Sequence, residues 1–391
     1  MKEKFISFIS KPRYIYLIYI FAAAASSVFK YLSGGHINNY LIFKNVYFNT
    51  IAENNLYAKY PELYFDNNHY GIFFSVLIAP FAVMPDWMGI VLWNIANVFV
   101  LIYAIEKLPF SAQQRAIFAW LCLQELITAL AYSQFNIALT GLIILSACYI
   151  YRQKEIKSAA AILIGFFVKI YGIVGLSAFF FVKNKKKFIL SLLVGAVVCF
   201  LLPMIFTSPQ FVLQSYSDWI EALQFKNNKN QFGDEGRQDI SLMGFVRRIT
   251  GHHEISNLTF LAFGLPIFGL PYLRIKWYQN RAFQLLILAS TLLFTVLFSS
   301  GSESPTYIIA VAGVMIWYVI QKEKTLFVNF LLVFVIVFTC FSTSDLFPRS
   351  FKVNYIIAYA LKAVPCIIVW FRIIWELMFF DFKEDYIIHE K

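Results

Sequence analysis

The sequence FILSLLVGAVVCFLLPMIFT, residues 188–207, contains no charged side chain over twenty consecutive positions. An α-helix rises about 1.5 Å per residue, so a helix of about 20 apolar residues crosses the hydrocarbon core of a lipid bilayer. A lysine cluster, residues 185–187, comes directly before the run. The stretch therefore predicts a transmembrane helix that starts at a basic membrane face.

The remainder of the chain has the same character. Of its 391 residues, 60% are hydrophobic and 14% are charged, whereas soluble domains carry about 25% charged residues because their surfaces face water. The composition excludes a soluble globule and predicts an all-α polytopic protein of the inner or plasma membrane. About twelve apolar runs are candidate spans: 12–32, 71–85, 87–105, 114–132, 135–151, 158–182, 188–207, 256–275, 281–299, 305–321, 325–343 and 353–379.

Basic residues predict the orientation of these spans. Four of the first thirteen residues are Lys or Arg, and cytoplasmic segments of membrane proteins are enriched in both. The N-terminus is therefore predicted to be cytoplasmic, and an even number of spans places the C-terminus there too. The long polar segments 33–70 and 208–255 then lie on the extracytoplasmic side of a single membrane domain, residues 1–391.

One segment conflicts with this orientation. The basic stretch 152–157 falls on the extracytoplasmic side if the run 158–182 crosses the membrane once. It returns to the cytoplasmic side if that run breaks at Gly165 or Gly172 into a re-entrant pair of helices. Lys169 would then lie at the turn between the two helices.

Three ionisable residues fall well inside apolar runs: Glu125, Lys169 and Lys362. Such residues are costly in hydrocarbon and are usually paired or line a cavity. Glu125 and Lys169 have similar depths in neighbouring runs. The sequence leaves two interpretations open, a buried ion pair between these two residues or a Lys169 side chain that faces substrate.

The polar segment 33–71 collects Asn, Asp, Glu and His side chains among many aromatic ones. Asn45, Asn49 and Glu53 recur at four-residue spacing between apolar residues, which predicts a helix that lies in the membrane interface. An Asn at its start is predicted to cap it. Five aromatic residues that follow either form an interfacial belt or stack on sugar rings.

Four short motifs follow one another along the chain. They are HYGIFFSVLIAPFAVMP (69–85), SQFNIALTGLIIL (133–145), FVKIYGIVGL (167–176) and DISLMGFVRR (239–248). With the preceding loop helix, and a tyrosine eighteen positions after Asn39, their order resembles the polyprenol-phosphate-dependent membrane glycosyltransferases of the GT-C fold, glycosyltransferase family 87 in particular.

The resemblance implies a GT-C-like fold and a specific reaction. A mannose-like hexose would move from a polyprenyl-phosphate sugar to a glycan or glycolipid acceptor on the extracytoplasmic side. The family places an aspartate at the head of the first-loop helix, whereas this chain has Asn39 there. An amide can hydrogen-bond a sugar hydroxyl but cannot take its proton. Either another carboxylate acts, or the chain is not an active transferase.

Transfer from a lipid phosphate needs one carboxylate for the acceptor proton and cations for the departing phosphate. Asp66 is predicted as the base because it lies on the aromatic loop, three residues ahead of His69; a structural role in a turn is the alternative. Arg247 and Arg248 either bind the phosphate or anchor the chain at the interface. Glu303 lies in a turn where Ser302 or Ser304 would otherwise cap the next helix.

The predicted site has catalytic and substrate-binding members. The catalytic residues are Asp66 and Asn39, and the substrate-binding residues are Asn38, Glu62, His69, Tyr70, Gln134, Asn136, Lys169, Arg237, Asp239, Ser241, Arg247, Arg248 and Glu303.

The remaining signals concern partners and rival functions. The net charge of +11 is spread over tails and short loops, which favours anionic lipid headgroups over nucleic acid. The acidic loop residues have no recognised metal spacing, so the sequence leaves open whether a divalent cation is a cofactor. A secondary transporter, a lipid-linked glycan polymerase or ligase, and a non-catalytic glycan-binding relative are the alternatives.

Overall fold

A computed structural model describes residues 10–33, 37–232, 238–382 and 385–388. Within these ranges the regular structure is helical, apart from one isolated bridge between Gln321 and Tyr386. The predicted all-α class is confirmed.

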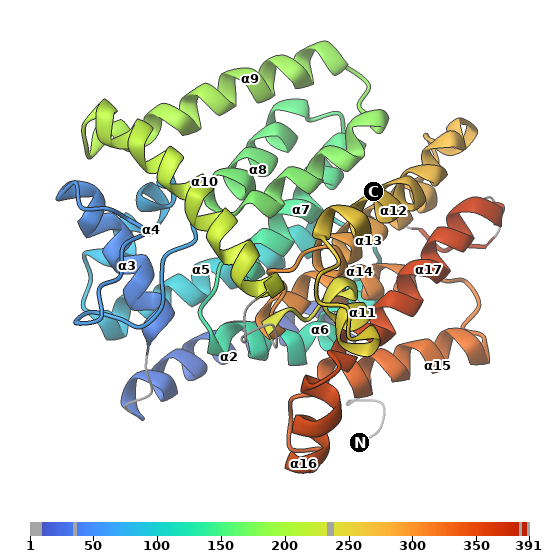
Figure 1. The fold of residues 1–391 in the computed structure, drawn as a ribbon. Helices are drawn as coiled ribbons and strands as arrows, with labels where there is room; N and C mark the ends of the chain where they lie inside the picture. Colours follow the sequence, from blue (N-terminus) through green and yellow to red (C-terminus); the bar gives the residue numbers. More distant parts are fainter. Residues whose placement is uncertain (1–9, 34–36, 233–237, 383–384, 389–391) are drawn as a thin grey trace. The chain divides into compact units, whose positions relative to one another are not determined.

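The helices are drawn in Figure 1. In chain order they are α2 (Pro12–Leu32), α3 (Asn38–Ile51), α4 (Phe74–Ala82), α5 (Asp86–Lys107), α6 (Ala112–Ala131), α7 (Asn136–Tyr151), α8 (Glu155–Val168), α9 (Lys185–Leu201), α10 (Pro209–Phe232), α11 (Leu242–Thr250), α12 (Asn257–Gly269), α13 (Arg281–Leu297), α14 (Tyr307–Ile320), α15 (Leu326–Val335), α16 (Arg349–Phe351) and α17 (Val364–Phe379). Shorter 3₁₀ and π segments are η1 (Ile170–Phe181), η2 (Leu202–Ile205), η4 (Leu270–Leu273), η5 (Ile275–Trp277), η6 (Ser304–Thr306), η7 (Ile336–Cys340), η8 (Lys352–Ile357) and η9 (Leu361–Ala363).

Three of these helices are long and apolar enough to cross a bilayer: α2, α5 and α9 with its continuation η2. A fourth span results if Arg349–Ile357 and Leu361–Phe379, which are bent by 74° at their junction, count as one. Six further apolar helical segments of the described residues have 10–17 residues each. The twelve predicted spans therefore stay a prediction.

The chain forms two compact units. The N-terminal unit consists of Tyr16–Lys107 and Ile127–Phe225, and the C-terminal unit of Met1–Ile15, Leu108–Leu126 and Lys226–Lys391. In the N-terminal unit, α7 packs against α5, α8 and η1, while α8 packs against α9. In the C-terminal unit, α13 packs against α14 and α17. A single membrane domain remains a prediction.

Polar residues fix where several helices begin. Asn184, Ser241, Ser256, Asn280 and Thr325 each accept a backbone N–H of the first turn that follows them. Such caps satisfy amide groups that have no partner inside the helix. The short polar connections therefore define the helix starts, and among the helices they cap α13 is almost entirely buried whereas most of α9 is not.

The run 158–182 is broken, as the re-entrant interpretation expects, although the break lies at Lys169 and not at Gly165 or Gly172. α8 ends at Val168, Lys169 is extended with φ −143° and ψ 120°, and η1 folds back against α8. A Cβ on Gly172 would lie only 2.2 Å from the carbonyl carbon of Gly165, so the two helical segments touch through their backbones. Lys169 lies at the turn of this hairpin, as the re-entrant interpretation requires.

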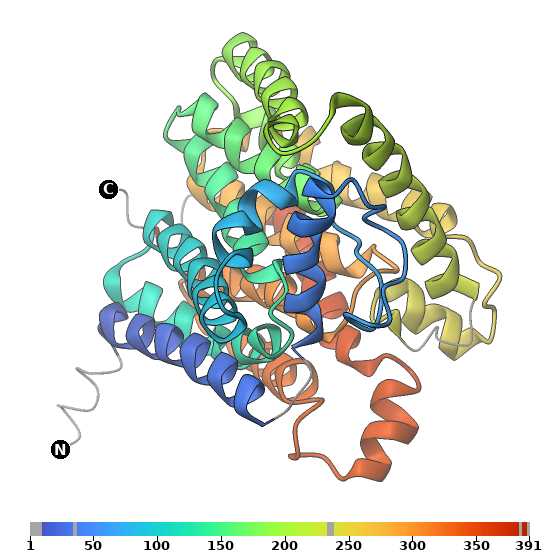
Figure 2. The ribbon, with the colours of Figure 1, turned by 90° about the vertical axis from the view of Figure 1, so that its left-hand side faces the viewer.

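The first polar segment differs from its prediction in one detail. The predicted loop helix exists as α3, and Figure 2 shows it in blue beside the loop that follows it. Its N-cap is Ile37, which has no side chain able to accept a hydrogen bond, so the predicted Asn cap is wrong. Asn38 and Asn39 lie inside the first turn and direct their amides to other parts of the chain.

Candidate active site

Lys169 anchors a polar cluster in the N-terminal unit. Its Nζ donates a hydrogen bond to Oδ1 of Asn136 over 2.8 Å, and Nδ2 of Asn136 donates to Oε1 of Gln134 over 2.7 Å. Asn136 is the first residue of α7 and is fully buried, whereas Lys169 is half-buried. The hairpin turn therefore presents a partly accessible ammonium group whose direction is fixed by an amide.

Tyr70 completes this cluster. The centre of its ring lies 6.0 Å from Nζ of Lys169, and its hydroxyl accepts the backbone N–H of Phe135 over 3.1 Å. The next residue, Gly71, donates its N–H to the carbonyl of Val168 at the end of α8. Three of the sequence motifs thus meet at one point. We call Tyr70, Gln134, Asn136 and Lys169 the Lys169 cluster.

Tyr57 holds the loop against this cluster. Its hydroxyl donates to the carbonyl of Tyr70 over 3.1 Å. Burial raises the pKa of the Tyr57 hydroxyl well above its ordinary value. The group therefore stays protonated and keeps its role as a donor over the physiological pH range.

The two asparagines at the head of α3 position backbone segments. Asn38 exchanges two hydrogen bonds with the backbone of Phe65, one through Nδ2 and one through Oδ1. Nδ2 of Asn39 donates to the carbonyl of Tyr132 over 2.8 Å. Asn38 therefore fixes the residue next to Asp66, and Asn39 fixes the connection between α6 and α7.

The predicted carboxylates of the first loop lie at its surface. Asp66 is exposed, has a left-handed φ of 80°, and accepts the N–H of Asn67 through Oδ1 over 2.9 Å. Asp tolerates this conformation better than most residues because its side chain bonds locally. Glu62 is exposed on the same loop. His69 is half-buried, and its carbonyl accepts a hydrogen bond from the Trp219 indole over 2.9 Å.

Helix α10 contributes residues that the predicted site lacks. Besides Trp219, Asp218 accepts hydrogen bonds from Asn55 over 3.1 Å and from Gln214 over 2.7 Å. Trp219 also lies close beneath Gly71, since a Cβ there would come within 3.1 Å of its ring. An Asp–Trp pair in a mostly polar segment is the sequence signal that could have identified them.

In the C-terminal unit, Arg247 and Asp239 form a buried ion pair. Nη1 of Arg247 lies 3.3 Å from Oδ2 of Asp239, and each residue has only 2% of its surface exposed. The guanidinium also donates to the carbonyl of Ile255 and to Oδ1 of Asn257. Arg247 therefore braces the connection between α11 and α12.

Asp239 lies at the centre of this arrangement. Burial raises its pKa to about 6, although the Ser241 hydrogen bond and the charges of Arg247 and Arg248 act in the opposite direction. Arg248 is half-buried and donates to the carbonyls of Asp239 and Ile357. Of the two arginines, Arg248 is the more accessible.

Glu303 has a structural role in the turn before α14. It is the N-cap residue of η6 and forms a reciprocal pair of hydrogen bonds with Thr306, so the predicted caps Ser302 and Ser304 are wrong. Its carboxylate also pairs with Lys226 over 3.2 Å. Ser304 instead accepts a hydrogen bond from Lys362 over 2.9 Å.

The buried ion pair of Glu125 has a different partner from the one predicted. Glu125 pairs with Lys362 over 2.9 Å, and both side chains are buried. Lys362 follows the bend at Ala360, which has a left-handed φ of 51°. The expected pair with Lys169 is wrong, because the bend brings Lys362 to Glu125. The rule that ionisable residues within apolar helices are paired still holds for both residues.

The predicted site residues therefore fall into two groups, one in each unit. The N-terminal group contains the Lys169 cluster and the first loop, and the C-terminal group contains Asp239, Ser241, Arg247, Arg248 and Glu303. Arg237 lies outside the described residues. Among the residues that are described, no group of three His, Cys, Asp or Glu side chains could hold a metal ion.

Apolar helices that enclose an amide–ammonium cluster and buried ion pairs are typical of an integral membrane protein with a polar site. The sequence pattern of glycosyltransferase family 87 matches residues 68–300, which is more than half of the chain. The chain belongs to glycosyltransferase family 87, and it is a membrane glycosyltransferase, as its motifs indicate. The matched range includes the Lys169 cluster and the Asp239–Arg248 motif, whereas Asn39 and Asp66 precede it.

Among curated proteins and among solved structures, no protein matches the chain significantly.

Proposed function

We propose that the protein transfers a hexose, mannose-like, from a polyprenyl-phosphate sugar to a glycan or glycolipid acceptor. The reaction takes place on the extracytoplasmic side of the inner or plasma membrane, with both termini in the cytoplasm. Family membership supports glycosyl transfer in general. The proposal of a lipid-phosphate donor is supported by the Lys169 cluster, because a lysine suits a phosphate group and an amide suits sugar hydroxyls.

The single observation that carries the proposal is the hydrogen bond between Lys169 and Asn136. An ammonium group oriented by an amide can also donate a hydrogen bond to a phosphate oxygen, because Lys carries three donors. Gln134 is half-buried and supplies an amide of the kind that binds sugar hydroxyls, and the buried Asn136 orients it. Tyr70 is buried, and its ring stacks on that of Phe43 at 4.8 Å, so it supports the cluster from within.

The chemistry requires one proton transfer. The acceptor hydroxyl oxygen forms a bond to the anomeric carbon, the bond from that carbon to the phosphate oxygen breaks, and the phosphate leaves with the electron pair. The acceptor proton passes to the carboxylate of Asp66, which is on the surface of the loop. Asn39 cannot take this proton, and it holds the Tyr132 carbonyl instead.

The arginines of the second motif have separate roles in this proposal. Arg248 is half-buried and is the proposed substrate-binding cation of the C-terminal unit, whereas Arg247 positions the loop through Asp239. Glu62, His69, Ser241, Glu303 and Arg237 remain proposed substrate-binding residues.

The proposal is tested with purified protein in lipid nanodiscs and a panel of polyprenyl-phosphate hexoses. We expect one donor to be consumed when an acceptor is supplied. Unchanged donors across the whole panel would contradict the proposal and favour a binding relative. Addition of EDTA, with and without returned Mg²⁺, determines whether a divalent cation takes part.

Asp66→Asn tests the proposed base. It should lower turnover by roughly 10²- to 10⁴-fold with little change in donor binding, because it removes a proton acceptor and preserves the shape. Glu221→Gln is the matched control, since Glu221 is an exposed carboxylate of the same unit that has no proposed role in the site. Full activity in Asp66→Asn, or activity that appears only after Asn39→Asp, would refute this assignment.

A further inference from the structure

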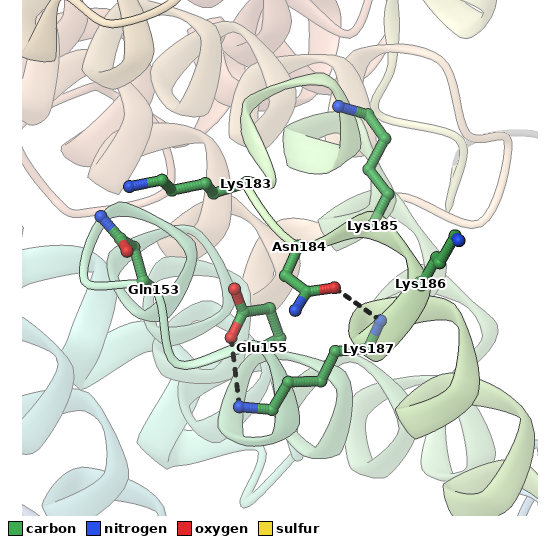
Figure 3. Close-up of a pocket in the computed structure, with 7 residues that line it drawn as sticks. All are labelled: Gln153, Glu155, Lys183, Asn184, Lys185, Lys186 and Lys187. Atoms are coloured by element: carbon green, nitrogen blue, oxygen red, sulfur yellow. Dashed lines mark hydrogen bonds and ion pairs between the residues drawn. The ribbon is translucent and has the colours of Figure 1, made fainter.

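A hollow of about 690 Å³ lies at the end of the α8–η1 hairpin that is opposite its turn. Figure 3 shows the residues around it, which come from the start of α8 and the connection before it, and from the first turn of α9 and the connection before it. Its lining consists of Gln153, Glu155, Lys183, Asn184, Lys185, Lys186 and Lys187.

The hollow is strongly basic. Four lysines line it against a single carboxylate, Glu155, which is buried and pairs with Lys187 over 3.6 Å. The Asn184 side chain accepts the backbone N–H of Lys187 and so fixes the start of α9. Lys183 and Lys186 are exposed, and among the residues that the structure describes their side chains have no hydrogen-bond or ion-pair partner. A negatively charged ligand would be attracted to this surface.

An apolar surface continues directly from the basic one. Along α9, side chains such as Ile189, Leu190, Leu193, Val194 and Val197 have more than two-fifths of their surface exposed. α9 with η2 is also one of the helices that are long enough to cross a bilayer. A ligand with a charged head and long hydrocarbon chains would match both parts of this surface.

The hairpin places this surface away from the proposed donor site. α8 contains fourteen residues and is therefore about 21 Å long, with the hollow at one end and Lys169 at the other. The ion pair between Glu155 and Lys187 brings the basic segments 152–157 and 183–187 to the same end. Because Lys and Arg are enriched in cytoplasmic loops, this end belongs at the cytoplasmic leaflet.

We infer that the hollow binds the phosphate headgroup of an anionic phospholipid of the cytoplasmic leaflet, whose acyl chains lie along the exposed face of α9. Basic surfaces next to a transmembrane helix on the cytoplasmic side attract anionic headgroups, because each Lys or Arg there adds a favourable interaction. This lipid would be a structural ligand, distinct from the sugar donor.

The test compares two double variants in nanodiscs that contain mixtures of phosphatidylglycerol and phosphatidylcholine. Phosphatidylglycerol retained by the protein is measured by native mass spectrometry after release from the nanodisc. Lys183→Gln with Lys186→Gln removes two lining charges without breaking a hydrogen bond or an ion pair among the described residues. Lys276→Gln with Lys322→Gln is the matched control, because both lysines are exposed and lie outside the hollow.

We expect wild type and the control to retain phosphatidylglycerol in preference to phosphatidylcholine. Each lysine near a membrane surface changes lipid affinity by about five-fold, so the Lys183–Lys186 variant should bind up to about 25-fold more weakly. An equal loss in the control would overturn the inference, because it would indicate general charge attraction. Displacement of the lipid by soluble glycerol phosphate would also overturn it, since the site would then select a free phosphoester.

Discussion

Lys169 and Arg247, two cations that the sequence predicts at the donor phosphate, have opposite kinds of surroundings. Lys169 is half-buried at a hairpin turn and donates to an amide oxygen. Arg247 has 2% of its surface exposed, pairs with the carboxylate of Asp239 and donates to a backbone carbonyl. Both residue types suit phosphate, but only one of these side chains is placed where a ligand can reach it.

The difference shows that the groups around a cation, more than its residue type, determine whether the cation can bind a ligand. A buried arginine whose charge is matched by a carboxylate serves the fold, because removal of either partner leaves an uncompensated charge. A partly exposed ammonium next to amides and tyrosine rings retains capacity for a further acceptor. The comparison therefore predicts that Arg247 variants lose stability and that Lys169 variants lose donor use.

The largest effect is expected for Arg247→Met. This change leaves Asp239 buried without its ion-pair partner, which typically costs about 3–5 kcal/mol of folding free energy. Thermal unfolding in detergent should reveal the loss, while the donor KM of protein that remains folded stays near the wild-type value. Arg248→Gln should do the opposite, with an unfolding temperature near that of wild type and a raised KM, since Arg248 is more exposed and is the proposed substrate-binding cation. A stable Arg247→Met protein with a raised donor KM would reverse the comparison.

Lys169→Gln should have the next largest effect. Loss of one charged hydrogen bond to the donor phosphate costs about 1.5–3 kcal/mol, or roughly ten- to a hundred-fold in kcat/KM. The unfolding temperature should change little, because the glutamine amide can still contact Asn136. Lys154→Gln, at an exposed lysine of the same unit, should behave as wild type. Unaltered kinetics in Lys169→Gln would remove Lys169 from the site.

Asn136→Asp sharpens the comparison by giving Lys169 the type of partner that Arg247 has. A carboxylate holds the ammonium more strongly than an amide by about 1 kcal/mol, so the donor should bind roughly five-fold more weakly. Direct donor binding measures this effect, and stability should be unchanged or slightly higher. Tighter donor binding in Asn136→Asp would indicate that Lys169 does not contact the phosphate.

The smallest effect concerns pH. The folded pKa of Asp239, about 6, is above the ordinary value near 3.8, so the folded protein binds this proton more tightly than the unfolded chain. The stabilisation is complete below the unfolded pKa and is lost as the pH rises through 6. Between pH 7 and pH 5 wild type should gain about 1 kcal/mol relative to Asp239→Asn. Identical pH profiles of unfolding would contradict this assignment.

Sequence patterns predicted the parts of the fold that depend on local chemistry. The charge of residues 152–157 indicated a break in the following run, and Lys169 lies at that break. The order of the motifs identified the family and several members of the Lys169 cluster. These signals are readable because the charge of a loop and the order of motifs are both properties of short segments.

Contacts between distant segments could not be predicted. Glu125 and Lys362 are 237 positions apart, and their pairing depends on a bend at Ala360 that no glycine or proline marks at that position. The amides of Asn38 and Asn39 bond to backbone groups, whose positions depend on the tertiary fold. Polarity in the sequence indicated which side chains need partners without identifying those partners.

The contact between Gly165 and Gly172 has a consequence for the range of donors. Because even a methyl group on Gly172 would collide with the opposite backbone, the hairpin cannot close further, and the length of α8 sets the depth of Lys169. A lipid-linked donor of the proposed kind would therefore meet the ammonium at a depth that the protein determines. Isoprene units beyond those near the phosphate would extend into bulk lipid, so donors with short and long tails should be used about equally well.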